Sequence, residues 1–126
     1  MRTLLTIGLA LTMLLPATAT NNMTNDDNNP LLKASTLAYG APDFSKIKNS
    51  DYLPAIEEGI RQQREEINAI VNNKKKPTFE NTILAYEKSG VLLDRVTSIF
   101  FGLVSADKTP EIAETEKKVI DRKSVV

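Results

Sequence analysis

Acidic side chains are the residues of this sequence best suited to chemistry, because it contains no histidine and no cysteine. Six charged residues lie within one expected helix face: Glu57, Glu58, Arg61, Arg64, Glu65 and Glu66. Two glutamates act as general acid and general base only when burial or a neighbouring charge separates their pKa values. Opposite charges three or four residues apart, such as Glu57 and Arg61, are instead typical of a solvated face. We therefore expect a wet surface here and no catalytic role.

The composition excludes further classes of function. Without histidine and cysteine, most metal-ligand and nucleophile chemistry is missing, so we expect no catalytic, cofactor-binding or metal-binding residue in this chain. The 16 basic and 16 acidic residues are scattered and give a net charge of zero, so no basic field attracts nucleic acid or an anionic membrane. The run Lys74-Lys75-Lys76 is short, and we expect it to be a solvated loop.

The first twenty residues have the pattern of a signal peptide. Arg2 supplies a positive start, an apolar run covers residues 4–15, and Pro16 precedes an A-x-A site that ends at Ala19. We predict that residues 1–19 are a signal peptide cleaved after Ala19. The exported product, periplasmic or secreted, is then expected to have no membrane partner. A retained membrane anchor is the alternative, although the apolar run is short for a bilayer span.

Residues 20–48 are expected to form a flexible leader followed by an extended segment. Residues 20–29 hold five asparagines and almost no apolar side chain, so burial cannot offset the entropy of ordering them. The rest contains prolines, a glycine and isolated apolar residues, which is typical of an irregular segment lying on another surface. Its expected anchors are Leu31, Leu32, Phe44 and Ile47.

Residues 49–120 show the apolar periodicity of an all-α region. A first helix is predicted over residues 52–72, where apolar residues recur at helical spacing: Leu53, Ile56, Ile60, Ile67 and Ile70. Ser50 and Asp51 are its capping candidates, and Pro54 is expected in its first turn. The fold class is therefore all-α, with antiparallel helices.

The stretch KPTFENTILAYEKSG starts a second predicted helix, which continues to residue 103. Thr78 is its expected N-cap, and Glu80 lies where the helix dipole favours a negative charge. Thr78, Glu80 and Asn81 are interpreted as capping or packing residues. The pair Ser89-Gly90 predicts a bend, a close approach by a neighbouring helix, or a break into two helices.

Apolar residues cover most of the circumference of this second helix. Such a helix is normally buried on several sides, and three helices offer little material for that. We therefore expect residues 49–120 to be an incomplete helical region, and the fragment of residues 20–120 to be partly helical and aggregation-prone on its own.

A third helix is predicted from Thr109 and Pro110 onward, with Ile112, Val119 and Ile120 as its apolar residues. The last six residues, DRKSVV, add no obvious helical continuation. They match the translation of a common sequencing-adapter read-through. Our hypothesis is that residues 121–126 are an artefact of this kind and that the natural protein continues after Ile120.

Five motifs occur in order between Asn29 and Ile120: NPLL at 29–32, PDF at 42–44, DYLPAIEEGI at 51–60, EINAI at 66–70 and PTFENTILAYEKSG at 77–90. Together they resemble the N-terminal region of the peptidyl-dipeptidase branch of the thimet oligopeptidase-like zinc metallopeptidases, which also includes oligopeptidase A. The resemblance covers the mature chain up to Ile120, but only a small N-terminal part of a full family member.

The resemblance implies an almost entirely helical, two-lobed protein with a deep channel, in which N-terminal helices form part of the wall. It also implies an enzyme that removes dipeptides from the C-terminus of short peptides. In that family an H-E-x-x-H helix and a downstream glutamate, much later in the chain, hold the zinc. None of those positions exists here, so this chain alone is expected to be inactive. Its implied partners are short peptide substrates and the missing C-terminal part of the same protein.

Three hypotheses stay open at this point. The chain is a channel-wall segment of an exported zinc peptidase, or a complete exported helical binding module without catalysis, or a small three-helix protein whose resemblance is chance. The first two differ in what they expect of the C-terminal half. A complete module should cap its third helix and bury Phe100 and Phe101, whereas a segment of a larger protein should leave both exposed.

Overall fold

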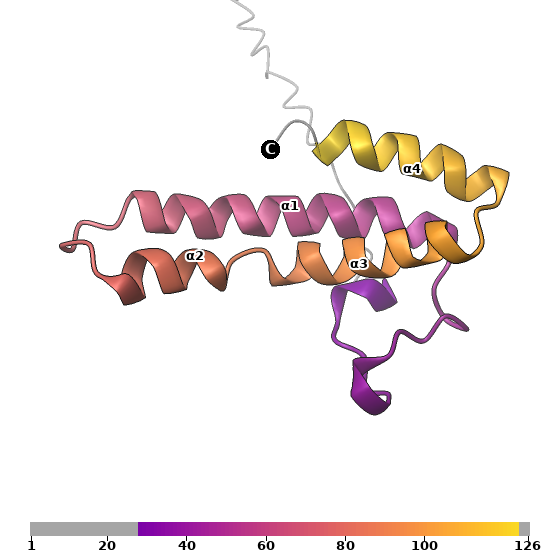
Figure 1. Cartoon of the computed structure of the whole chain (residues 1–126), viewed down its shortest axis with the longest axis horizontal. Coiled ribbons are helices and arrows are strands. Elements are labelled where there is room, and N and C mark those ends of the chain that lie inside the picture. Colours follow the sequence, from indigo (N-terminus) through magenta and orange to yellow (C-terminus); the bar gives the residue numbers. More distant parts are fainter. Residues whose placement is uncertain (1–27, 124–126) are drawn as a thin grey trace, which may run out of the picture.

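The computed structural model describes residues 28–123, and all regular secondary structure in this range is helical. The elements are η1 (Pro30–Leu32), η2 (Ala38–Gly40), α1 (Asn49–Val71), η3 (Phe79–Leu84), α2 (Ala85–Glu87), α3 (Val91–Ala106) and α4 (Pro110–Lys123). Figure 1 shows α2 and α3 running back along one side of α1, and α4 on another side of it. The all-α prediction is confirmed. The predicted signal peptide, residues 20–27 of the leader and residues 124–126 lie outside the described residues.

Helix α1 begins at Asn49, three residues earlier than predicted, because Lys48 and Asp51 close its first turn. The backbone N–H of Lys48 donates to the Asp51 carboxylate at 2.7 Å. Asp51 is therefore a capping residue as expected, although it acts from the first turn and not from the position before the helix. Pro54 lies inside the helix and not in its first turn, so that prediction is wrong.

The second predicted helix is two helical segments, because Gly90 adopts a left-handed conformation with φ of 76°. Its backbone N–H donates to the Glu66 carboxylate of α1 at 2.7 Å. The interpretation as a break is confirmed, and the continuous helix over residues 79–103 is wrong. Thr78 is the N-cap as predicted: its hydroxyl accepts from the Asn81 N–H at 3.2 Å, and its own N–H donates to the Asn81 amide oxygen at 2.8 Å.

The core lies between α1, α3, α4 and η1. Its buried side chains are Leu31, Tyr52, Ala55, Ile56, Ile60, Leu92, Leu93, Val96, Phe100, Ile112 and Val119. The backbones of α1 and α3 approach closely at Gly59: a Cβ atom there would lie 2.8 Å from the Leu93 Cα. The Tyr52 and Phe100 rings pack with centroids 5.1 Å apart. Burial of these apolar surfaces is the main force that holds the helices together.

Outcomes for individual apolar residues are mixed. Leu31 is buried, and Leu32 and Ile47 are partly buried against the core, so these anchors of the extended segment are confirmed. Phe44 is 53% exposed and anchors nothing. Phe100 is fully buried and Phe101 is partly buried, contrary to the exposure expected of a segment.

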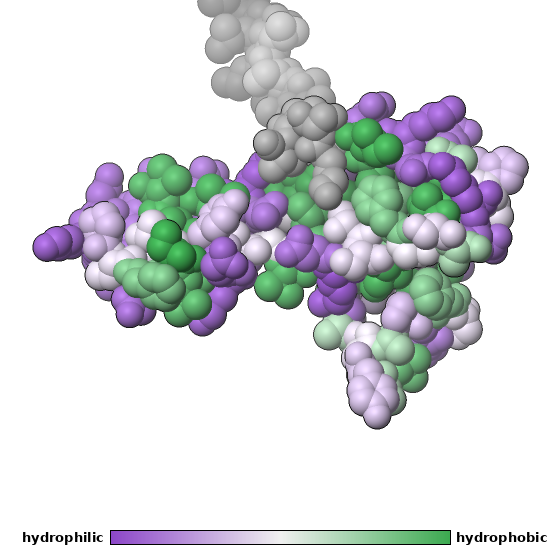
Figure 2. Space-filling view, viewed as in Figure 1, coloured by the Kyte–Doolittle hydropathy of each residue, from purple (hydrophilic) through white to green (hydrophobic). Residues whose placement is uncertain are grey.

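Residues 61–88 form an arm, the far half of the α1–α2 pair, and not one of them is buried. The core residues lie before Arg61 and after Lys88 in the sequence, so the arm extends beyond the core. Its exposed large apolar residues are Val71, Phe79, Ile83 and Tyr86. Figure 2 shows the corresponding hydrophobic surface at the end of the molecule away from α4.

Helix α4 continues through Lys123, so the expectation that DRKSVV adds no helical continuation is wrong for residues 121–123. The Arg122 guanidinium pairs with the Glu57 carboxylate at 3.0 Å. Glu57 was expected to pair with Arg61, yet its carboxylate pairs with Arg122 of α4. That residues 121–126 are an artefact stays a hypothesis.

The charged face of α1 is not uniformly wet. Glu58 is only 8% exposed, and its carboxylate accepts from Arg61 Nε at 2.8 Å, Arg61 Nη2 at 2.6 Å and Gln62 Nε2 at 2.8 Å. These contacts raise the pKa of the Arg61 guanidinium, with Glu58 as the main cause. The prediction of a solvated surface is therefore wrong for Glu58, because a bidentate partner satisfies its charge where water does not reach it.

We expect Gly59→Ala to destabilise the chain by about 1–3 kcal/mol, because the added methyl group meets the Leu93 backbone, which cannot rotate away. Gly102→Ala is the matched control: apart from its own stretch of helix, no atom lies within 4 Å of its Cβ position, and alanine is the better helix former by about 1 kcal/mol. Urea unfolding of both variants measures the difference. Midpoints that move in the same direction would contradict a close helix contact at Gly59.

We expect Glu58→Ala to cost about 1–2 kcal/mol, since it removes a buried carboxylate that accepts three hydrogen bonds. Glu65→Ala removes the other partner of the same arginine, but that carboxylate is exposed, so its cost should stay below about 0.5 kcal/mol. Thermal unfolding followed by circular dichroism compares the two. Equal costs would mean that burial adds nothing to the Glu58 interaction.

Candidate functional site

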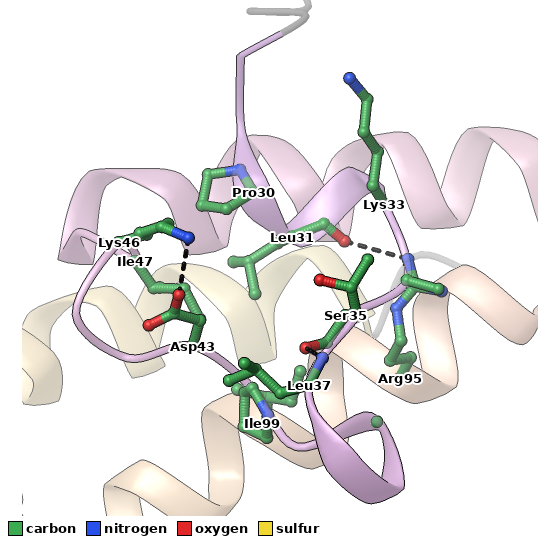
Figure 3. A pocket seen from close by; sticks show the side chains of 14 residues that line it. Pro30, Leu31, Lys33, Ser35, Leu37, Asp43, Lys46, Ile47, Arg95 and Ile99 are labelled. Atoms are coloured by element: carbon green, nitrogen blue, oxygen red, sulfur yellow. Dashed lines mark hydrogen bonds and ion pairs between the residues drawn. The ribbon is translucent and has the colours of Figure 1, made fainter.

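A cleft lies outside the core, between the N-terminal segment and α3. It holds about 170 Å³, and ten of its lining residues are labelled in Figure 3. The segment is fixed above it by polar contacts. The Asn29 amide oxygen accepts from the Leu31 N–H at 2.9 Å, and its Nδ2 donates to the Asp51 carbonyl at 2.9 Å. From α3, Arg95 Nη2 donates to the Leu31 carbonyl at 3.1 Å.

Two charged residues that line the cleft, Asp43 and Lys46, pair with each other. The Asp43 carboxylate accepts from the Ser45 hydroxyl at 2.6 Å and pairs with Lys46 Nζ at 2.9 Å. The hydrogen bonds from Ser45 and Lys46 lower the pKa of the Asp43 carboxyl. Asp43 therefore stays ionised at neutral pH and is unsuited to act as a general acid.

The size of the cleft limits what it can hold. Pockets for small-molecule ligands usually measure about 300–1,000 Å³. The space of about 170 Å³ below the N-terminal segment suits one side chain or a few waters. A more open groove of about 400 Å³ lies between the start of α1 and α4, where the buried Asn49 Oδ1 has no hydrogen-bond partner. Neither space brings together the groups of a catalytic site.

The tip of the N-terminal segment carries a strained backbone that the sequence did not indicate. Tyr39 has a φ of 59° and Gly40 a φ of 68°, so two consecutive residues are left-handed. Glycine adopts this conformation at little cost, whereas tyrosine does so rarely. The Tyr39 ring is fully exposed, so no packing within the described residues compensates for the strain.

The residues singled out from the sequence have structural roles. Glu57 pairs with α4, Glu58 with Arg61, and Glu66 accepts from the Gly90 N–H. Thr78 and Asn81 cap η3. Among residues 28–123 no group of three or more acidic side chains is placed to hold a metal ion. The carboxylates are spread along α1 and not gathered at one point.

One stretch within residues 28–123, Phe79–Ala106, is long and apolar enough to cross a membrane when only length and composition are considered. The left-handed Gly90 breaks this stretch, and its second half packs Leu93, Val96 and Phe100 into the core. We therefore interpret it as a core helix and its flanking arm.

No family model matches this chain. Over 89 residues it is 51% identical to a dipeptidyl carboxypeptidase of Salmonella typhimurium, a match that covers 71% of this chain and 13% of that protein. Over 90 residues it is 49% identical to a dipeptidyl carboxypeptidase of Escherichia coli K12, which covers 71% and 13%. The chain thus spans only a small part of the length of the curated relatives it matches. At this identity, the chain belongs to the dipeptidyl carboxypeptidase family.

Proposed function

We propose that this chain is the N-terminal segment of an exported zinc metallopeptidase that removes dipeptides from the C-terminus of short peptides. The observation that carries the proposal is the identity of about half with two proteins named dipeptidyl carboxypeptidase. The all-helical fold and the absence of a catalytic constellation in residues 28–123 are consistent with a segment that supports a site formed elsewhere.

The segment is proposed to act as a wall and not as a catalyst. The chain has no histidine and no cysteine, and among residues 28–123 no group of three or more acidic side chains could hold a metal ion, so these residues do not fit a zinc ion. The metal ligands and the general base would come from the remainder of the peptidase. The contribution of α1 to α4 is then steric: a packed set of helices excludes folded proteins from the channel and admits short peptides.

We expect a full-length hybrid enzyme, in which residues 29–120 replace the matching segment of the Escherichia coli dipeptidyl carboxypeptidase, to be active. Because the segment supplies no catalytic group, the hybrid should release C-terminal dipeptides from an N-blocked short peptide within about tenfold of the parent rate. Mass spectrometry of the products measures this.

The parent enzyme without its matching segment is the control, and the 126-residue chain alone should release nothing with or without zinc. A hybrid that folds and binds zinc like the parent, yet releases no dipeptide, would contradict the proposed function.

Export gives a separate prediction. If the signal peptide is recognised, the mature product begins at Thr20, because cleavage follows the A-x-A site at Ala19. Expression of the chain in a Gram-negative host, followed by N-terminal sequencing of the periplasmic fraction, measures the new terminus. A product that keeps Met1 and stays with the membrane would support a retained anchor instead.

A further inference from the structure

We propose that the apolar face of the arm, formed by Phe79, Ile83 and Tyr86, docks onto the part of a dipeptidyl carboxypeptidase polypeptide that lies outside the matched segment. This inference rests on the proposed function. It adds to that function by naming the surface through which the segment joins the rest of the enzyme.

The three residues lie on one side of η3 and α2. Their spacing of four and three positions places them on successive turns of the same face. All three are large and exposed, at 64% for Phe79, 51% for Ile83 and 60% for Tyr86. Single exposed apolar residues are common, but a run of three along one helix face is typical of a contact surface.

The arm also lacks a core of its own. No residue between Arg61 and Lys88 is buried, so apolar burial contributes little to holding this part of α1 against η3 and α2. At the base of the arm, the Gly90 N–H donates a hydrogen bond to the Glu66 carboxylate at 2.7 Å, and this bond joins α1 to the chain between α2 and α3. A pair of helices held mainly at its base gains the missing burial when a partner covers its apolar face.

The remainder of the enzyme is the occupant that fits best. The matched residues make up only 13% of each relative, so most of a family member lies outside this segment and is available to pack against it. A second copy of this chain is the competing occupant. In such a dimer, the same three side chains of the two copies would pack against each other. That arrangement would not explain what covers the arm when the segment is part of a larger enzyme.

Hydrogen exchange followed by mass spectrometry tests the proposal on the full 126-residue chain and on the full-length hybrid enzyme described above. We expect amides of residues 61–88 to exchange at least about tenfold more slowly in the hybrid, because the docked arm no longer opens locally. The double variant Phe79→Ser/Tyr86→Ser should remove that protection in the hybrid. It should leave exchange in the isolated chain unchanged, since both rings are exposed there.

The matched control is Tyr39→Ser/Phe44→Ser, which removes two exposed aromatic rings from the N-terminal segment. It should preserve the protection of residues 61–88 in the hybrid. Equal exchange in chain and hybrid, or equal loss in both double variants, would overturn the docking inference. Protection in the isolated chain that rises with its concentration would also overturn it and would identify a second copy as the occupant.

The assay of dipeptide release distinguishes a failure of the docking inference from a failure of the proposed function. A hybrid that releases dipeptides while its arm stays unprotected contradicts only the docking inference. A hybrid that folds and binds zinc like the parent but releases no dipeptides contradicts the proposed function on which the inference rests.

Discussion

The backbone contact between Gly59 and Leu93 is the constraint on which the rest of this structure depends. With no side chain at Gly59, α1 and α3 approach until a Cβ atom would lie 2.8 Å from the Leu93 Cα. This short separation allows Ile56, Val96 and Phe100 to become fully buried in one layer. In close packing of this kind, even one added methyl group destabilises the contact. The position of α3 against α1 in turn places Arg95 where it holds the N-terminal segment.

Gly90 is the second constraint, and it separates the core from the arm. Its left-handed backbone turns the chain between α2 and α3, and its N–H is satisfied by a carboxylate from α1. The same residue therefore ends one helical segment and attaches the next to its neighbour. The side chain of Gln63 lies so close to Gly90 that a Cβ atom there would meet its Nε2 at 2.5 Å. The base of the arm is fixed by polar groups, while its outer face remains apolar.

Local features of this fold could be predicted from the sequence, whereas features that depend on a distant partner could not. The Thr78 cap needs only Asn81, three residues away, and it is where the pattern indicated. The break at Gly90 was one of several interpretations, because the choice depends on Glu66 in another helix. Glu58 was placed on a solvated face for the same reason: helix periodicity gives the direction of a side chain, but burial depends on what packs nearby.

The same distinction between local and long-range features applies to the candidate site. The absence of histidine and cysteine can be read directly from the sequence, and so can the family resemblance, which the comparison with known carboxypeptidases supports. The small cleft could not be predicted, because it forms where a segment without regular pattern crosses α3. Nor could the conformation of Tyr39, since no residue in its neighbourhood other than Gly40 signals a left-handed turn.

The hydrogen bond between Arg95 and the Leu31 carbonyl also predicts an order of folding. It joins residues 64 positions apart, whereas the contact between Gly90 and Glu66 joins residues 24 apart. The entropic cost of closing a loop rises with its length, so the α1–α3 pair is expected to form before the N-terminal segment settles on it. During synthesis the segment is made first, yet it has no surface to lie on until α3 has been made. The N-terminal segment, which is synthesised before the helices it packs on, is therefore expected to be among the last parts to reach its native position.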